Sequence, residues 1–574
     1  MERKKKNGRL IVSKIIVVML MLVLMLSMLP SCSNPNGETV TDPTADPTKS
    51  PTTEPAQGEE LDESVMEGNT YLTGLPIVKE KETITVAVAR HSNDATESYE
   101  EKHFVIKAEE DTNIHIEWME YSTNIEEQLS VLLAGDMPDV FLGLLTDSHI
   151  SQNPSLFLPL NDLIEEKCPN VYAYYQENVD GWREFLTYPD GNIYSMMGSY
   201  YKSYNNLING LQFINMEWLN NVGKSMPTTL AEYKDVLMAF RDQDANGNGD
   251  PKDEIPIDFC QNHYAAHIMD YATMWGIPYY YAIKDGVVTE TINTNAYREF
   301  LEYFHELGQE GLLNVEGFSQ TEEQYSSHLD SMSVGAFHGW APYTYINDFE
   351  KQQKYAVLPP IAADGYEPVI HVNSRTQASR NNFVITKDCE NPTAALRWWD
   401  YLSSTQEMAM FVNRGEEGII YELGDDGKYY AHTPTAEDLK EFGYDKYVSN
   451  IGTSSFAASL GTVNNHPLVY NSISADIVKD PTNTTSIRTI AMNEYAPYFE
   501  KEIMSQAIIP SSKLEEYTFS TEGLLDYINS FTASSIIDGV TDASWDEYVK
   551  QLGVYNYPYY ISWNQDYYDG KFVE

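Results

Sequence analysis

The chain has 574 residues and a formal net charge of −49, because 86 acidic side chains outnumber 37 basic ones. A surface this acidic repels nucleic acids and anionic lipid headgroups, so the composition excludes a nucleic-acid-binding function. The length beyond the N-terminal segments described next is sufficient for two lobes with separate hydrophobic cores.

Residues 1–31 have the three parts of a bacterial export signal. A basic start precedes an apolar run over residues 15–28, and Leu29-Pro30-Ser31-Cys32 follows, an order typical of a signal peptide. The run is short for a permanent membrane span, although an uncleaved anchor helix is the alternative. The last four residues resemble a lipobox, which implies that Cys32 is acylated, with palmitate for example, after cleavage. We therefore expect a lipid-anchored protein on the extracellular face of the cell membrane.

Residues 32–80 form an acidic segment that is rich in Pro and Thr and nearly free of aromatic residues. Such a composition cannot bury enough apolar surface to fold, so we expect a disordered stalk before a folded part at residues 81–574. Repeated prolines and like charges extend a stalk of this kind. The three cysteines beyond Cys32 allow at most one disulfide, and we expect them to be buried thiols.

The folded part begins with a parallel α/β unit. Residues 83–89 are a β-prone apolar run, which predicts a strand covered on both faces. Apolar residues at helical spacing over 125–133 predict a helix, and residues 140–143 predict the next strand. A strand, a helix and a strand in this order indicate parallel pairing with a crossover helix.

Two later helices carry start signals. Thr229 and Glu232 are spaced as a capping box before the amphipathic residues 233–240. Asn391 stands as a potential N-cap directly before Pro392, which suits a first helical turn. With the N-terminal unit, these helices predict a mixed α/β chain.

Residues 242–254 alternate oxygen-bearing side chains with glycines, a pattern that suits Ca²⁺ because calcium takes six to eight oxygen ligands. Two registers fit. The first begins at Asp242, with Gly247 at the sharp turn and Asp253 closing the loop. The second begins at Asp244 and continues through Asn246, Asn248 and Gly249 to Asp253 and Glu254. The alternative is a solvated turn without metal.

Six segments in a fixed order carry a family resemblance: LSVLLAGDMPDVF (129–141), LFLPLNDLIEEKCPN (156–170), DGNIYSM (190–196), MEWLNNVGKSMPTTLAEYKDVLMAF (216–240), DANGNGDPKDEIP (244–256) and RWWDYLSSTQ (397–406). With them the chain resembles the family 1 extracellular solute-binding proteins of carbohydrate ABC importers, in particular their large lipoprotein subgroup. The resemblance is specific over residues 83–430 and loose over residues 435–574.

The resemblance implies an α/β periplasmic-binding-protein-like fold of type II, in which two lobes joined by a hinge enclose a ligand cleft. We expect lobe 1 at about residues 81–205 and 335–395, and lobe 2 at about residues 206–334 and 396–574. Ligands in α/β folds bind beyond the carboxyl ends of the strands, and closure about the hinge is the expected motion.

The implied function is capture of a carbohydrate, in particular an oligosaccharide, and its delivery to the transmembrane subunits of an ABC permease. We expect a monomer without catalytic residues. The family's version of the calcium loop resembles the second register, which implies a structural Ca²⁺ held by Asp244, Asn246, Asn248, Asp250, Asp253 and Glu254, with Asp250 contributing its backbone carbonyl.

Tyr and Trp are abundant, at 42 and 9 residues. Sugar rings stack their apolar faces on aromatic side chains, and their hydroxyls need fixed polar partners. Candidates at strand ends, near crossovers or in a loop resembling a cleft loop of the family are Arg90, His91, Tyr200, Tyr201, Gln212, Trp275, Trp340, Arg375 and Glu417. A core or solvated structural role is the alternative for each.

Three other functions remain open from the sequence. A surface glycoside hydrolase needs two carboxylates about 5 to 10 Å apart across the sugar bond, and acidic residues are plentiful. The GxSxG, HExxH and P-loop patterns are absent from the sequence. An oligopeptide or other cargo in the same fold, and a sugar-binding adhesion or sensor module, are the remaining alternatives.

Overall fold

The computed structural model describes residues 65–572, except 92–93, 123–124, 180, 199, 202–207, 251, 347, 373–376, 428, 433, 451–458, 462–485 and 505–506. The predicted signal peptide, Cys32 and most of the predicted stalk lie outside the described residues. Residues 61–574 form one compact unit, to which the description below applies. No helix among the described residues is both long and apolar enough to cross a membrane.

The folded part begins earlier than the sequence indicates. Strands β1 (Met66–Glu67) and β2 (Thr70–Tyr71) pair as a small hairpin. Ile77 and Val78 are fully buried in the hydrophobic core that also contains Val86 and Val88. The expectation of a stalk up to residue 80 is therefore wrong beyond residue 64. Ile77 and Val78 anchor this segment because they join a core formed by residues far along the chain, and Tyr71 is buried as well.

The first sheet has the strand order β4-β3-β5-β15-β6. Strand β3 (Glu82–Ala89) runs parallel to β4 (Ile114–Tyr121) and β5 (Val140–Leu142), as predicted. Strand β15 (Phe383–Ile385) joins antiparallel between β5 and β6 (Ser195–Met196). Val86 and Val88 enter one core while Ala87 enters another, so both faces of the sheet are covered, as a nearly continuous apolar strand requires.

The second sheet has the order β13-β8-β12-β9. Strand β8 (Leu211–Asn215) lies antiparallel to both β12 (Val334–Gly339) and β13 (Tyr355–Val357), and β9 (Ile255–Asp258) runs parallel to β12. It too is buried on both faces, since Ile214 enters one core and Phe213 another.

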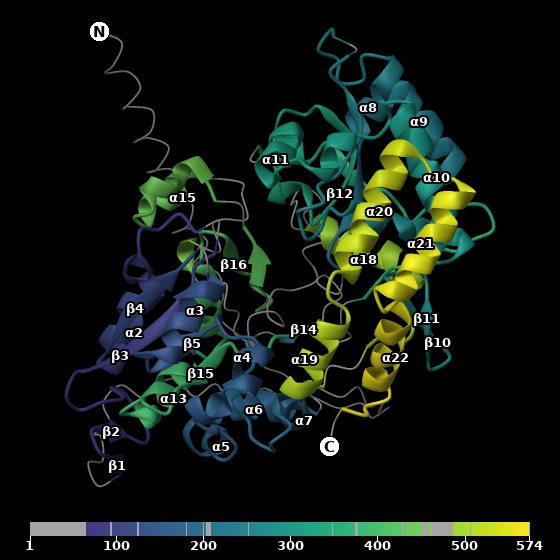
Figure 1. Ribbon diagram of the computed structural model, residues 1–574. Helices are drawn as coiled ribbons and strands as arrows, with labels where there is room; N and C mark the ends of the chain where they lie inside the picture. Colours follow the sequence, from purple (N-terminus) through teal and green to yellow (C-terminus); the bar gives the residue numbers. More distant parts are fainter. Residues whose placement is uncertain are drawn as a thin grey trace, which may run out of the picture. The chain divides into compact units, whose positions relative to one another are not determined.

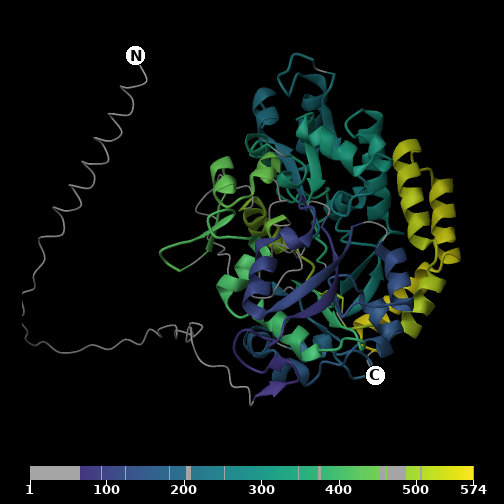
Figure 2. The same cartoon turned by 90° about the vertical axis from the view of Figure 1, so that its left-hand side faces the viewer.

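Helices surround both sheets (Figures 1 and 2). Near the first sheet are α2 (His103–Thr112), α3 (Ile125–Ala134), α4 (Asp147–Gln152), α5 (Leu163–Lys167), α6 (Pro169–Asn178), α7 (Trp182–Leu186) and α13 (Pro392–Tyr401). Near the second are α8 (Met216–Asn221), α9 (Leu230–Asp242), the 3₁₀ helix η4 (Ile268–Trp275), α10 (Asn295–Gln309) and α11 (Glu322–Asp330). The helices α20 (Leu524–Asp538), α21 (Asp542–Val554) and α22 (Tyr557–Tyr568), yellow in both figures, contribute to the same core as α10.

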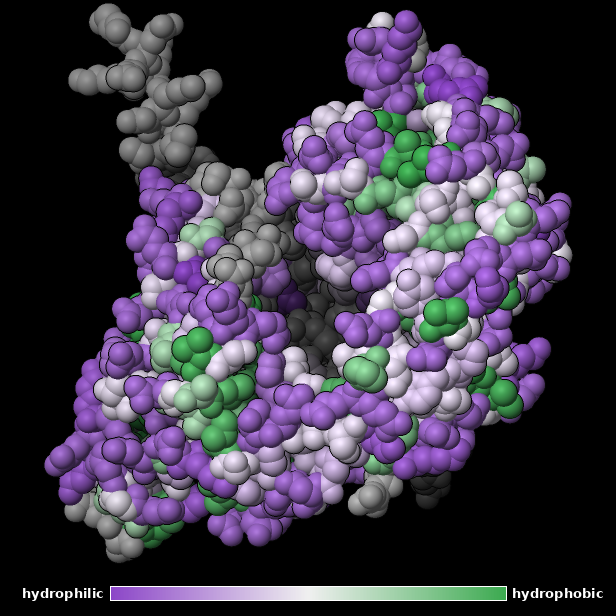
Figure 3. Space-filling model, viewed as in Figure 1, coloured by the Kyte–Doolittle hydropathy of each residue, from purple (hydrophilic) through white to green (hydrophobic). Residues whose placement is uncertain are grey.

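Further elements follow the first two groups along the chain. They are α12 (Phe349–Gln352), α14 (Gln406–Arg414), α15 (Ala436–Glu441), α18 (Ser486–Tyr495), α19 (Ser511–Ser520) and the hairpins β10 (Tyr281–Lys284) with β11 (Val287–Glu290) and β16 (Tyr421–Leu423) with β17 (Tyr429–Ala431). On the face seen in Figure 3, hydrophilic side chains predominate, in keeping with the acidic composition.

The predicted N-caps form, but the reciprocal half of the predicted capping box does not, because the Glu232 side chain accepts from the backbone N–H of Thr228 and not of Thr229. The Thr229 side chain accepts from the backbone N–H of Glu232 at 3.2 Å, and Asn391 accepts from Ala394 N–H at 3.1 Å. The cysteines described by the structure are free thiols, of which Cys168 and Cys260 are buried. Burial raises the pKa of the Cys168 thiol well above its usual value.

The expected lobe boundaries need correction in two places. Strands β12 and β13 pair with β8, so the return to the first sheet follows residue 357 and does not occur at residue 335. Helix α13 and Val412 of α14 belong to the core of the first sheet, although residues from 396 onward were expected in the second lobe. Pairing between distant strands decides the first boundary and packing into the core decides the second, and a local sequence pattern contains neither kind of information.

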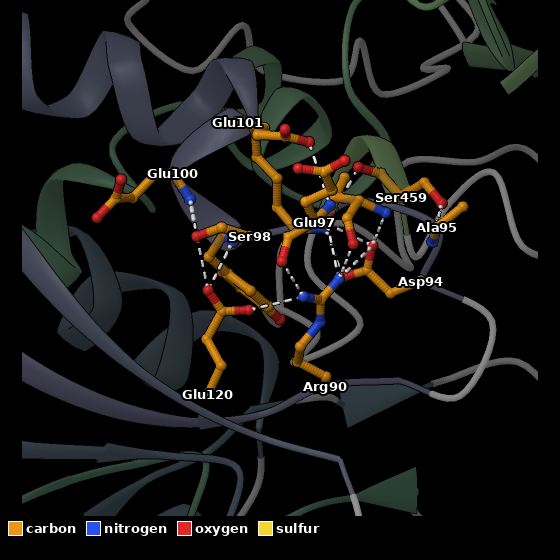
Figure 4. A network of polar contacts seen from close by, with 12 residues as sticks. Arg90, Asp94, Ala95, Glu97, Ser98, Glu100, Glu101, Glu120 and Ser459 are labelled. Carbon is orange, nitrogen blue, oxygen red and sulfur yellow. Dashed lines mark hydrogen bonds and ion pairs between the residues drawn. The ribbon is translucent and has the colours of Figure 1, made fainter. Parts of the chain in front are cut away.

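A buried ion cluster ties residues 459–461 to the first sheet. Lys102, with no exposed surface, lies 3.0 Å from Asp94 Oδ2 and donates to the carbonyls of Ser459 and Gly461 at 3.2 and 2.9 Å. Figure 4 shows the neighbouring contacts, in which the Arg90 guanidinium lies between Glu120 and Asp94. A buried ammonium is tolerated because a carboxylate and two carbonyls replace its water shell.

Replacing Lys102 tests this cluster. We expect Lys102→Ala to lower the free energy of unfolding by about 3–5 kcal/mol, because the buried Asp94 carboxylate loses its nearest cation and keeps only the Arg90 guanidinium, 3.4 Å away. Chemical denaturation measures the change. In helix α2, which begins directly after Lys102, Lys107 forms an exposed pair with Asp111, and Lys107→Ala is the matched control with an expected loss below about 1 kcal/mol. Equal losses for the two variants would contradict a supporting role for the cluster.

Candidate functional site: a polar cavity beside the second sheet

A cavity of about 440 Å³ lies where β8 begins and β12 ends. Gln212 of β8 and His338 of β12 are directly paired in register, so their side chains project from the same face of the sheet. Both line the cavity, together with residues of η4, of the segment 360–371 and of α20. Gly210 also lines it, and a Cβ there would stand 2.3 Å from the His338 ring, so the close approach of β8 to His338 requires glycine.

Gln212 supplies an unsatisfied acceptor to this cavity. Its side chain is 7% exposed, and its amide oxygen Oε1 has no hydrogen-bond partner. Buried polar atoms are nearly always paired, so an orphaned one in a cavity wall indicates a partner that comes from outside the fold. Gln212 is a residue that the sequence placed among the ligand contacts, and the structure puts it in the cavity wall.

Asp270 and two histidines form the polar centre of the wall. The Asp270 Oδ2 atom accepts from the backbone N–H of His267 at 3.1 Å, which caps η4, and lies 3.3 Å from His338 Nδ1. His338 Nδ1 also lies 2.7 Å from the carbonyl oxygen of Ala265. Burial lowers the pKa of His338, and it lowers the pKa of the nearby His263 to about 4. Both rings are therefore neutral at pH 7.

Exposed aromatic rings border the cavity. Tyr279 is 39% exposed and stacks on His371 with ring centroids 4.7 Å apart and planes 13° apart. The His371 Nδ1 atom contacts Glu500 Oε2 at 2.7 Å, which fixes the orientation of the stack. Tyr264 is 56% exposed and also lines the cavity. Flat, partly exposed rings next to fixed polar groups form the combination that sugar binding needs.

These two tyrosines were not predicted. Tyr279, Tyr280 and Tyr281 are consecutive, but the latter two are each 9% exposed and belong to the core. No local signal separates Tyr279 from its neighbours, because the turn into β10 and the position of His371 determine which ring remains accessible. Tyr264 follows His263 in a loop and likewise carries no distinguishing spacing.

Two of the predicted aromatic residues occupy other surroundings. Trp275 is 3% exposed and packs against Phe300 and Tyr303, so it is a core residue and its assignment to the ligand site is wrong. Trp340 is half-buried behind Tyr264, with ring centroids 6.4 Å apart, and does not line the cavity. The Arg488 guanidinium lies 3.6 Å from the centroid of its ring.

The charged candidates also lie away from the cavity. Arg90 has a structural role in the ion cluster, His91 is an exposed loop residue, and Glu417 accepts from Leu423 N–H at 3.1 Å within its own loop. Arg375 lies outside the described residues.

Tyr200 and Tyr201 form β7, which pairs antiparallel with β14 (Gln377–Ala378). Both short strands lie where the chain passes between the two sheets, because β6 and β15 belong to the first sheet and β8 and β13 to the second. The predicted crossover position of these tyrosines is therefore consistent with the order of the strands.

The calcium-like loop follows α9. The Asp244 Oδ2 atom accepts from Gly249 N–H at 3.0 Å, and Asp253 accepts from the amides of Asn246 and Asn248 at 2.9 and 2.6 Å. Gly247 has a φ of +74°, a left-handed turn that glycine adopts without strain.

Two carboxylate oxygens of this loop, Asp244 Oδ1 and Glu254 Oε2, are buried without a hydrogen-bond partner. Burial raises the pKa of Glu254, and the adjacent Asp253 raises it further. Among the described residues there is no group of three or more His, Cys, Asp or Glu side chains placed to hold a metal. The loop instead combines carboxylates with amide oxygens, a donor set that suits Ca²⁺. Asp242 turns away and pairs with Arg241 at 2.7 Å, which favours the second register.

Two known proteins, a substrate-binding protein and a lipoprotein, are similar to the chain in sequence. It is 25% identical over 489 residues to the fructooligosaccharide ABC transporter substrate-binding protein FusA of Streptococcus pneumoniae, an alignment that covers 82% of this chain and 87% of that protein. The chain is homologous to FusA. Lipoprotein LipO of Bacillus subtilis is 32% identical over 126 residues, or 21% of this chain and 25% of LipO. No protein-family model matches the chain.

Solved structures agree in fold. FusA in complex with kestose gives a TM-score of 0.73 at 22% identity, covering 85% of this chain and 99% of FusA. A solute-binding protein described as binding HMO, from Bifidobacterium longum infantis, gives 0.71 at 22% identity, covering 86% of this chain and 100% of that one. Another FusA structure is of an EF-hand mutant in complex with fructo-nystose. The two-lobed α/β fold and the resemblance to carbohydrate ABC importer proteins are thus confirmed.

Proposed function

We propose that this chain is a solute-binding lipoprotein that captures an oligosaccharide in the cavity beside β8 and β12 and delivers it to an ABC importer. The orphaned amide oxygen of Gln212, buried in a wall that also contains the stacked Tyr279, carries the proposal. A sugar hydroxyl satisfies such an acceptor, while the apolar face of the same ring packs on the tyrosine. Homology to FusA supports this class of ligand.

The order of the strands supports hinge closure as the motion that accompanies capture. The first lobe would contain residues 65–197 and 377–461, and the second lobe residues 208–372 and 486–572. The paired strands β7 and β14 belong to the two segments that connect β6 to β8 and β13 to β15. Few residues absorb the rotation in such a hinge, and the packed lobes move as units.

Titration against oligosaccharides tests the proposed function. We expect calorimetry with kestose and a panel of neutral oligosaccharides to give saturable heat for at least one sugar, and thin-layer chromatography of the same mixtures to show that sugar intact. Products of cleavage would indicate a hydrolase. Heat with oligopeptides but with none of the sugars would indicate another cargo in the same fold, and either outcome would overturn the proposal.

Removing the aromatic platform should weaken binding. We expect Tyr279→Ala to raise the dissociation constant for the sugar found in that titration by about 10- to 100-fold, because a stacking surface at the cavity is lost. Tyr559→Ala is the matched control, since Tyr559 lies on α22 and bonds Glu516 at the surface. An unchanged constant in a Tyr279→Ala protein that melts like the wild type would remove Tyr279 from the site.

The membrane anchor and the permease belong to the same proposal. Acylation of Cys32 would hold the protein at the extracellular face of the membrane, where a loaded binding protein meets the importer. The name of LipO as a lipoprotein supports this location. Metabolic labelling with a palmitate analogue should mark the wild type, and loss of the label in Cys32→Ala is the expected result.

We further propose a structural Ca²⁺ in the loop at residues 244–254. The buried, unpartnered oxygens of Asp244 and Glu254 supply ligands that lack a protein donor, and the FusA EF-hand mutant indicates such a loop in a homologue. Asn246, Asn248, Asp253 and the backbone carbonyl of Asp250 would complete the set. The ion would neutralise neighbouring carboxylates and join the end of α9 to the start of β9.

Melting in calcium and in chelator tests the site. With calcium at about 100 times its dissociation constant, occupancy adds about 2.7 kcal/mol of stability, which corresponds to about 2–3 °C for a chain of this size. We expect the wild type to show that difference between calcium and EGTA, and Asp244→Ala to lose it. Asp242→Ala is the control, because loss of the response there would select the first register. A wild type that melts identically in both buffers would contradict the calcium proposal.

A further inference from the structure

The cavity wall carries a negative charge at Asp270. The side chain of Asp270 is 33% exposed and lines the cavity together with the orphaned Gln212. Its Oδ2 atom is held by the His267 N–H at the start of η4, so the position of the carboxylate is determined by backbone geometry. A carboxylate fixed in this way accepts hydrogen bonds from a ligand without losing rotamer freedom on binding.

Among the described residues, no Lys or Arg side chain forms an ion pair with Asp270, and its cavity neighbours His267 and His338 are imidazoles. His338, 3.3 Å away, is buried, which lowers its pKa and keeps the ring uncharged at pH 7. At the rim, His371 contacts a second carboxylate, that of Glu500, which is 6% exposed. The Arg488 guanidinium does not line the cavity; it lies over the Trp340 ring and donates to the carbonyls of Trp340 and Ile208. The net charge of −49 adds a long-range field of the same sign.

We propose that Asp270 makes this cavity selective for uncharged sugars and excludes sugar acids. The inference rests on the proposed function, and it names the class of sugar that the site accepts. A neutral ring offers hydroxyl donors to Asp270 and to Gln212 Oε1. A uronic acid instead brings a second carboxylate into the partly enclosed cavity next to the first, and built-in repulsion of this kind is an effective source of specificity.

The test compares sugars that differ only in charge. Trisaccharides of glucose, of galactose and of fructose are each titrated beside the same trisaccharide with one primary hydroxyl oxidised to a carboxylate. For every trisaccharide that binds the wild type, we expect the dissociation constant of the oxidised form to be at least about 30-fold higher than that of its neutral parent. The reason is the repulsion between like charges in the cavity. In Asp270→Asn the ratio of the two dissociation constants should fall to within about 3-fold.

Asn retains an oxygen that can accept from the His267 N–H, so the cap of η4 is preserved in the variant. Asp546→Asn removes one negative charge from the outer face of α21, away from the cavity. We expect this variant to retain the wild-type ratio of the two dissociation constants. Thermal melting of both variants reports whether the fold is intact.

The outcomes separate this inference from the proposed function. An oxidised sugar that binds the wild type as tightly as its parent, or a ratio that is the same in Asp270→Asn and the wild type, overturns the selectivity while sugar capture stands. Equal changes in Asp270→Asn and Asp546→Asn would assign the selectivity to net charge and would also overturn a role for Asp270. If no trisaccharide binds, the proposed function itself fails and the inference fails with it.

Discussion

The candidate site depends on the antiparallel pairing of β8 with β12. This register places Gln212 opposite His338, and the absence of a side chain at Gly210 lets the two strands bring the His338 ring against the backbone of β8. The ring then lies within reach of Asp270, and the cap of η4 becomes part of the cavity wall. A shift of one residue would turn both side chains to the opposite face and abolish the cavity.

Buried polar groups have two distinct roles in this molecule. Lys102 and Asp94 satisfy each other and two carbonyls inside the first lobe, so they consolidate the fold. Gln212 Oε1, Asp244 Oδ1 and Glu254 Oε2 are equally shielded from solvent but have no partner. In the proposed function, partners from outside the fold satisfy these oxygens, a sugar hydroxyl at Gln212 and a cation at Asp244 and Glu254.

Aromatic residues divide in a similar way. Most of the tyrosines have a structural role. Tyr548 of α21, for example, stacks on Phe531 of α20 with ring centroids 3.8 Å apart. Tyr264 and Tyr279 retain exposed faces because each lies in a loop at the border of the second sheet. The abundance of tyrosine therefore indicates a sugar-binding class without identifying the residues that contact the ligand.

Features that depend on neighbouring residues could be predicted from the sequence. The strand at 82–89, the caps at Thr229 and Asn391 and the composition of the calcium-like loop all follow from local spacing, because their hydrogen bonds join residues a few positions apart. Gln212 was a candidate because of its place near a possible crossover, and a motif resemblance indicated the two-lobed fold that homology to FusA supports.

Only the tertiary structure decided the rest. Trp275 and Tyr279 are four residues apart with similar surroundings in sequence, yet one packs on α10 and the other borders the cavity. Asp270 lies 3.3 Å from His338, 68 positions away in the chain, and Ile77 and Val78 are buried in a core assembled from distant segments. Burial and accessibility depend on which strands pair across the whole chain, and that pairing is a property of long-range packing that local spacing does not encode.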